Sequence, residues 1–298
     1  MGSRRGRGAR RVACGIAAAL CAMASMLGAQ TAQASRAAPG TPPSRAHALI
    51  ALRIHPRVGD TLYTRFEQSV DMEGTARVGA SDTTMRSSST LLLLAHVFVQ
   101  GSDEQGTTVT TITDSVEVGG AGPATELVRR ALQGKKVQLR IAPDGSAVVL
   151  ESQAAIASDM QAVVSGVPAT LPSQAVAVGE SWEKAMSIPV AGREVSSRPA
   201  TLRARYRLDS LSSDGAIAYI SMRGTITRDP APELPERIRI TSSGTIEGSM
   251  QVDRRRGWWC DSRATIRLES VVTMFDASRP PMRVTTRIDQ RMGTWTPR

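Results

Sequence analysis

The chain has 298 residues, of which 41% are hydrophobic and only 3% aromatic, and its formal net charge is +10. Five arginines and no acidic residue lie in residues 1–34, so removal of that segment from the 37 basic and 27 acidic residues leaves 32 against 27, a net charge of +5. A basic surface that has few aromatic side chains for base stacking argues against nucleic-acid binding.

The first segment has the pattern of a secretory signal peptide. Arginines precede an apolar stretch from Val12 to Leu27, and the small residues Ala32 and Ala34 form a cleavage motif. The apolar stretch is shorter than the ~20 residues that span a bilayer, which favours cleavage over an uncleaved anchor. We predict a signal peptide at residues 1–34, a flexible leader at residues 35–49, no integral membrane segment after cleavage, and a periplasmic or secreted protein.

The cysteines indicate that no internal disulfide holds the mature chain together. Cys14 and Cys21 leave with the signal, so Cys260 has no partner. Its neighbours Trp258 and Trp259 favour a buried, inert thiol over a reactive one.

Residues 50–170 predict a first β-rich half. The pattern from Leu62 to Met72 alternates with period two, which is typical of a half-buried strand. Leu91–Val99 is apolar on both faces, as in a central strand, and a turn at Gly101–Gly106 leads into its partner. Val137–Ile141 runs into the tight turn Pro143-Asp144-Gly145.

Two short helices interrupt these strands. The first is expected at Pro123–Gln133, with a proline at its start and Gly134 as its stop. The second is expected at Ser152–Ser165, with Gly166 after it.

Residues 171–298 predict a second β-rich half. Leu202, Ala204, Tyr206 and Leu208 alternate with arginines and Asp209, and Ser213-Asp214-Gly215 turns this strand into its partner. Four further segments follow, at Ile238–Ile240, Ile246–Val252, Ala264–Met274 and Met282–Met292. One face is apolar and the other arginine-rich, which is the antiparallel pattern.

A motif that occurs twice relates the two halves. Val58-Gly59-Asp60-Thr61 opens the first half and Val178-Gly179-Glu180-Ser181 opens the second. We take Gly59, Gly179 and the following Trp182 as structural residues. The predicted fold is mainly β (α+β), with antiparallel sheets built from two related β-rich halves and two short helices.

The second motif carries a family resemblance. Leu171-Pro172 followed by Val176-Ala177-Val178-Gly179-Glu180-Ser181-Trp182 resembles a family of uncharacterised exported bacterial proteins. The resemblance covers roughly residues 50–292 and implies no activity. The strand pattern is also similar to periplasmic lipoprotein-carrier folds, which implies a curved antiparallel sheet around an apolar cavity.

No residue pattern indicates catalysis. Ser181 and Lys184 have the spacing of penicillin-recognising serine enzymes, but in a strand they point to opposite faces. The histidines His47, His55 and His96 are not spaced as zinc ligands. Arg254-Arg255-Arg256 is expected in a hairpin turn, as a solvated cluster or an anionic-lipid contact. We predict no enzyme, no cofactor and no metal.

Two functions stay open at this point. If two sheets face each other, the core is closed and the protein is an exported partner-binding or structural module of the cell envelope, with an envelope protein as partner. If the apolar face stays uncovered, it lines a cavity for a lipid or another apolar ligand. The candidate lining residues are Leu91, Leu93, Val97 and Val99.

Overall fold

The computed structural model describes residues 48–78, 81–119, 123–152, 170–188, 200–228, 238–274 and 280–296. These residues form two antiparallel meanders and one short helix. The first meander consists of β1 (Thr61–Val78), β2 (Ser81–Asp103), β3 (Gly106–Gly119), the helix α2 (Pro123–Leu132), β4 (Lys136–Ile141) and β5 (Ala147–Ser152). The second consists of β6 (Ser181–Ile188), β7 (Ala200–Leu211), β8 (Ile217–Arg228), β9 (Ile238–Asp253), β10 (Trp258–Met274) and β11 (Met282–Trp295).

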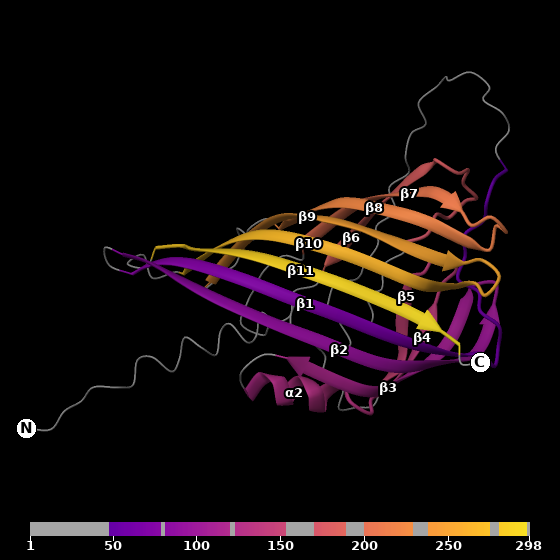
Figure 1. Cartoon of the computed structure of the whole chain (residues 1–298), viewed down its shortest axis with the longest axis horizontal. Helices are drawn as coiled ribbons and strands as arrows, with labels where there is room; N and C mark the ends of the chain where they lie inside the picture. Colours follow the sequence, from indigo (N-terminus) through magenta and orange to yellow (C-terminus); the bar gives the residue numbers. More distant parts are fainter. Residues whose placement is uncertain are drawn as a thin grey trace, which may run out of the picture.

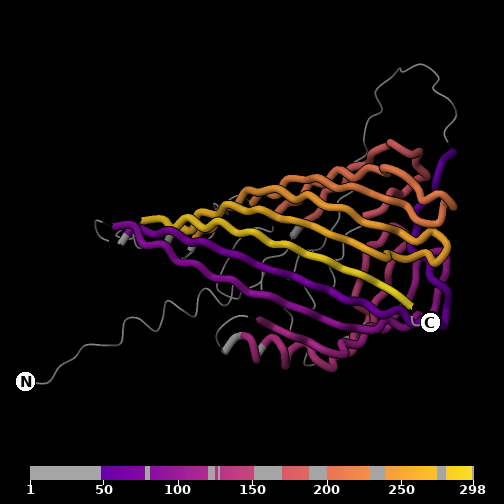
Figure 2. The backbone as a smooth tube through the Cα atoms, viewed as in Figure 1, coloured from indigo at the N-terminus to yellow at the C-terminus, as the bar shows by residue number. Residues whose placement is uncertain are grey.

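The two meanders join along β1 and β11 into a single sheet. The strand order is β5-β4-β3-β2-β1-β11-β10-β9-β8-β7-β6, so β5 and β6 are the edges. The sheet curls, so that the edge strands lie behind the central ones (Figures 1 and 2). The predicted mainly β, antiparallel class is confirmed, and the two halves share one sheet.

The curled sheet has a narrow end and a wide end. The narrow end is at the β1–β2 turn, and the wide end is at the turns β2–β3, β4–β5, β7–β8 and β9–β10 (Figure 1). Neighbouring strands of the curled sheet approach closely at three glycines. A Cβ at Gly224, Gly244 or Gly248 would collide with a backbone carbonyl of the neighbouring strand.

The segment before β1 closes the wide end. Ile50 forms a bridge with Val176, and the Ile54 amide donates to the Pro143 carbonyl at 2.8 Å. The His55 amide donates to the Gly257 carbonyl, also at 2.8 Å. This segment therefore ties the β4–β5 turn to the β9–β10 turn. It also buries Ile50, Leu52 and Ile54 in the core.

The repeated motif forms the same turn twice. Gly59 and Gly179 have φ of 91° and 90°, a region that favours glycine. The Gly59 amide donates to the Val99 carbonyl, and the Gly179 amide donates to the Leu208 carbonyl. The next residue of each motif, Asp60 or Glu180, accepts a bond from the same neighbouring-strand residue. The second copy is anchored further by half-buried Trp182, which stacks on Tyr206 at 5.8 Å and donates to the Thr170 carbonyl.

The structure confirms some of the predicted elements, contradicts one prediction and does not describe the residues of others. The helix predicted at Pro123–Gln133 is confirmed as α2. The prediction of separate segments at Ile238–Ile240 and Ile246–Val252 is wrong, because both belong to β9, which continues through Thr241–Thr245 with its ladder to β10 intact. The signal peptide, the leader up to residue 47 and most of the second predicted helix lie outside the described residues.

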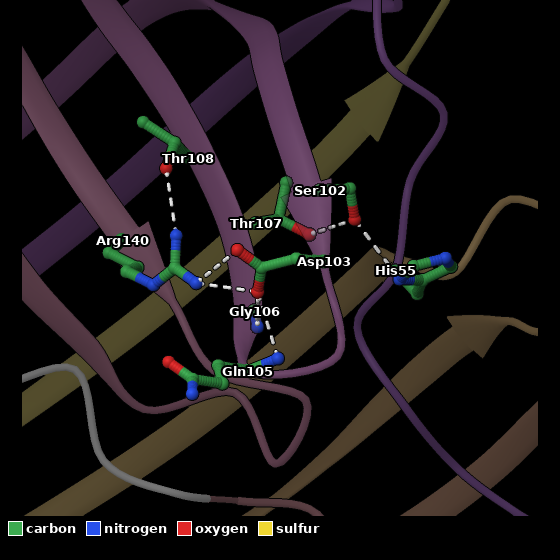
Figure 3. A network of polar contacts seen from close by, with 8 residues as sticks. All are labelled: His55, Ser102, Asp103, Gln105, Gly106, Thr107, Thr108 and Arg140. Atoms are coloured by element: carbon green, nitrogen blue, oxygen red, sulfur yellow. Dashed lines mark hydrogen bonds and ion pairs between the residues drawn. The ribbon is translucent and has the colours of Figure 1, made fainter.

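Asp103 fixes the turn between β2 and β3. Its Oδ1 accepts hydrogen bonds from the Gln105 and Gly106 amides at 2.8 and 3.0 Å, and the Arg140 guanidinium on β4 binds both carboxylate oxygens (Figure 3). The hydrogen bond from Arg140, with the backbone donors, lowers the pKa of Asp103. The carboxylate thus connects three strands at the wide end.

We expect Gly257→Ala to destabilise the fold more than an alanine at another left-handed glycine. Gly257 has φ of 62°, and an added Cβ would collide with the backbone of His55. Gly134 has φ of 71°, and no atom lies within 4 Å of an added Cβ. Chemical unfolding should give a loss of about 1 kcal/mol for Gly134→Ala and about 3 kcal/mol for Gly257→Ala. Equal losses would contradict the role given to the closing segment.

We expect Asp103→Asn to lower stability at neutral pH and to have no effect in strong acid. Because the folded-state pKa is lowered, the contribution of the carboxylate is complete above about pH 4, where an unfolded aspartate is ionised. It is lost as the pH falls through the folded pKa. Urea unfolding midpoints of the wild type and the variant should therefore converge on acidification, and a constant difference would count against the Arg140 contact as its source.

Candidate functional site

The two faces of the sheet differ in chemistry along the strands of the second meander. On β7, Ala200, Leu202, Ala204, Tyr206 and Leu208 are buried, and the residues between them are exposed. Paired residues of neighbouring strands share a face, so the register extends this division across the whole sheet. We call the apolar side the inner face and the arginine-rich side the outer face.

The inner face has two zones. Near the wide end its side chains are buried in the core, as for Val97, Val99 and Val252. Further along the strands, a group of apolar side chains is only half-buried. We call this group the apolar floor, and its members are Phe66, Met72, Leu91, Leu93, Met222, Val272, Val284 and Met292.

The four residues named from the sequence as ligand-lining lie on one side of β2 but divide between the two zones. Leu91 and Leu93 belong to the floor, and Val97 and Val99 are buried in the wide-end core. Ligand binding by these four side chains stays a prediction. Sequence reasoning missed Phe66 and Met292, which are register partners on β1 and β11. Their alternation marked them as apolar, but no local signal indicated that strands so distant in the sequence pair.

Gln68 is a buried polar residue of the inner face. Gln68 on β1 is paired in register with Leu91 and Gln290, and it is only 7% exposed. The Nε2 atom of Gln68 has no hydrogen-bond partner in the described part of the chain. A buried amide donor without a partner costs about 1–3 kcal/mol. Gln68 is therefore suited to donate a hydrogen bond to an oxygen of a bound molecule.

A hydroxyl contacts an imidazole at the wide end. Ser102 Oγ lies 3.0 Å from His55 Nδ1 and 3.1 Å from Thr107 Oγ1 (Figure 3). The neighbouring Asp103 carboxylate binds Arg140 and two turn amides, and so it does not orient the imidazole. This contact links the closing segment to the β2–β3 hairpin.

The remaining candidate chemical groups are dispersed. His96 pairs with Asp114 at 2.7 Å on the outer face, far along the chain from His55, and His47 lies outside the described residues. Lys184 Nζ is 3.7 Å from Asp144 Oδ2, and it pairs in register with Ala204 on the inner side, whereas Ser181 pairs with Arg207. Within the described ranges no three His, Cys, Asp or Glu side chains gather as metal ligands.

Cys260 is half-buried, and its thiol lies 3.5 Å from the Gln251 carbonyl. Burial, together with the nearby Asp253 carboxylate, raises the pKa of the Cys260 thiol. A raised pKa disfavours the reactive thiolate, in agreement with the inert role predicted from the sequence.

The outer face carries a grid of charged side chains. Arg267 pairs with Glu247 at 2.8 Å and Arg287 with Asp289 at 2.8 Å. A shallow groove of about 490 Å³ crosses β8 to β11 and is lined mostly by outer-face residues, among them Arg223, Arg263 and Arg291. Such a grid presents charged and polar groups to the solvent.

The arginine triplet that the sequence singled out contacts both its own hairpin and the neighbouring β7–β8 turn. Arg254 donates to the Gly215 carbonyl at 2.7 Å, Arg255 lies 3.1 Å from Asp214, and Arg256 lies 3.6 Å from Asp253. These contacts tie the β9–β10 turn to the β7–β8 turn. They favour a structural role for the triplet over an anion-binding one.

No helix in the described ranges is both long enough and apolar enough to cross a membrane.

Comparisons with solved structures give only distant likenesses. The outer membrane protein OprG from Pseudomonas aeruginosa aligns at 7% identity over 83% of this chain and 100% of its own, with a TM-score of 0.23. An outer membrane channel from Pseudomonas putida F1 aligns at 10% identity over 86% of this chain and 100% of its own, with a TM-score of 0.23. DynF from the dynemicin biosynthesis pathway of Micromonospora chersina aligns at 11% identity over 90% of this chain and 94% of its own, with a TM-score of 0.21. TM-scores of this size carry no argument about fold or function.

No curated protein matches the chain. Residues 155–259 match the sequence model of a family described as a family of unknown function (DUF6263). The match contains the Val-Gly-Glu-Ser-Trp motif at residues 178–182. The predicted resemblance to a family of uncharacterised proteins is thereby confirmed over this segment of the chain.

Proposed function

We propose that this protein is an exported, non-enzymatic β-rich protein of the cell envelope that binds a lipid or another apolar ligand against the inner face of its sheet. Of the two functions left open by the sequence, this was the alternative to a partner-binding or structural module. Export rests on the signal-peptide pattern of residues 1–34.

The observation that carries the proposal is the half-buried apolar floor. The curled sheet encloses a buried core near its wide end. The described strands all belong to one sheet, and the apolar floor of its inner face is only half-buried. An apolar surface of this kind gains free energy when a ligand covers it, about 0.8 kcal/mol for each buried methylene group.

The chemistry of the inner face favours an acyl ligand over a plain hydrocarbon. Phe66, Leu91 and Leu93 offer apolar contact, and Gln68 offers an amide donor in the middle of them. An ester, amide or carboxyl oxygen of an acyl lipid would satisfy that donor.

A second candidate function, partner binding, is favoured by one feature of the outer face. Tyr63 stacks with Trp295 at 6.2 Å, and Trp295 and nearby Phe98 are 45% and 42% exposed. Exposed aromatic side chains are common at the centres of protein interfaces.

We expect lipid to copurify with the protein. The full chain is expressed with its own signal, purified without detergent and extracted with organic solvent for mass spectrometry. A stoichiometric acyl lipid is the expected result. A lipid-free protein that also fails to bind a fluorescent fatty-acid analogue would sink this proposal and leave partner binding as the better candidate.

We expect neighbouring leucines of β2 to differ in their effect on ligand binding. Leu93 is paired with Phe66 on the inner face, whereas Leu92 is paired with Glu67 on the outer face, and both are half-buried. Leu93→Gln should weaken binding of the fatty-acid analogue about tenfold, because it places a polar group against the acyl chain. Leu92→Gln is the matched control and should leave the affinity unchanged, and equal effects would place the ligand elsewhere.

A further inference from the structure

The outer face of the second meander carries more arginines than carboxylates. Three successive rows across β6 to β11 contain eight arginines and three carboxylates, those of Glu183, Glu247 and Asp289. Asp209 and Asp261, at the border of these rows, add two more carboxylates. We call the eight the arginine face, and they are Arg203, Arg205, Arg207, Arg223, Arg263, Arg267, Arg287 and Arg291. All eight are exposed.

Part of this surface places like charges side by side. Arg205 and Arg223 stand directly opposite each other on β7 and β8, and like charges at such positions are destabilising. Each also has a carboxylate opposite it on its other neighbouring strand, Glu183 for Arg205 and Glu247 for Arg223. Arg203, Arg205 and Arg223 form no ion pair with the described residues. The other five arginines of the face lie 2.8 to 3.9 Å from a carboxylate oxygen. A cluster of unpaired, exposed guanidinium groups favours an anionic partner from outside the chain.

The groove on this face combines guanidinium groups with two carboxylates. Arg223, Arg263 and Arg291 line it together with Ser249, Glu247 and Asp289. Each guanidinium group can bind two oxygens of a phosphate at once, so a headgroup would engage the arginines and not the carboxylates.

We propose that the arginine face adsorbs the protein onto a bilayer surface rich in anionic phospholipid headgroups. The side chains between the arginines in these rows are serine, threonine, glutamate, aspartate and Ala185, so the face lacks the large apolar or aromatic anchors on which specific protein interfaces depend. It likewise lacks aromatic rings for stacking the bases of single-stranded nucleic acid. Adsorption to an anionic bilayer needs neither, and each arginine near the surface strengthens it about fivefold.

This inference does not depend on an apolar ligand. The arginine face is on the opposite side of the sheet from the apolar floor, so occupancy of one does not block the other.

The test is sedimentation of the purified full chain with vesicles. Vesicles of phosphatidylcholine mixed with phosphatidylglycerol are compared with vesicles of phosphatidylcholine alone, at low and at high salt. We expect binding to the mixed vesicles only, and weaker binding at high salt, because salt screens exposed charges. Equal binding to both vesicle types, or none to the mixed ones, overturns the proposal.

A charge-matched pair of variants locates the surface. Arg203→Gln, Arg205→Gln and Arg223→Gln together should weaken adsorption on the order of 100-fold. The control combines Arg53→Gln, Arg57→Gln and Arg77→Gln, three exposed arginines outside the face that form no ion pair with described residues. Equal losses in both triple variants would mean that net charge alone acts, which contradicts the proposal. Stronger binding of duplex DNA than of vesicles at the same face would assign it to nucleic acid instead.

Discussion

The pairing of β1 with β11 is the constraint on which the rest of the structure depends. These strands come from opposite ends of the folded chain, and their register runs from Tyr63 opposite Trp295 to Thr75 opposite Arg283. Each meander alone is a sheet with two edges. The β1–β11 ladder removes one edge from each and aligns their apolar faces, with Val70 opposite Ile288 on the inner side. The continuous inner face exists only because this long-range ladder forms, after its large loop-closure entropy has been overcome.

The same pleat gives the sheet two chemically different faces. Successive side chains of a strand point to opposite faces, so a residue that extends the apolar floor is followed by one that extends the charged grid. On β10, buried Ile266 and Leu268 flank Arg267, which binds Glu247 on β9. The outer ion pairs are exposed, and such pairs contribute little to stability. Inner-face burial is therefore the main source of stability, and the outer face is free to vary its charge for binding.

Local patterns predicted most of the strands. They failed where long-range pairing determines whether a segment belongs to a strand. Alternation in Leu202–Leu208 and the turn residues Asp144-Gly145 and Asp214-Gly215 identified strands and hairpins, because side-chain direction and positive φ are local properties. The polar stretch Thr241–Thr245 was predicted to end a strand, yet the ladder to β10 carries it as part of β9. For the candidate site, Leu91 and Leu93 were found by their apolarity. Gln68 was counted only as one more inner-side residue, since nothing local indicates that a glutamine will be buried without a partner.

The closure of the wide end limits how a ligand can reach the apolar floor. Leu52 and Ile54 of the closing segment are at most 2% exposed, and Leu171 beside the β4–β5 turn is fully buried. Entry through that end would require the Ile54 and His55 hydrogen bonds to break together with this packing. The half-buried floor residues Met72, Val272 and Val284 lie toward the narrow end instead. The proposed ligand would therefore reach the floor with least disruption from the narrow end, with its polar group near Gln68 and its chain directed along the strands.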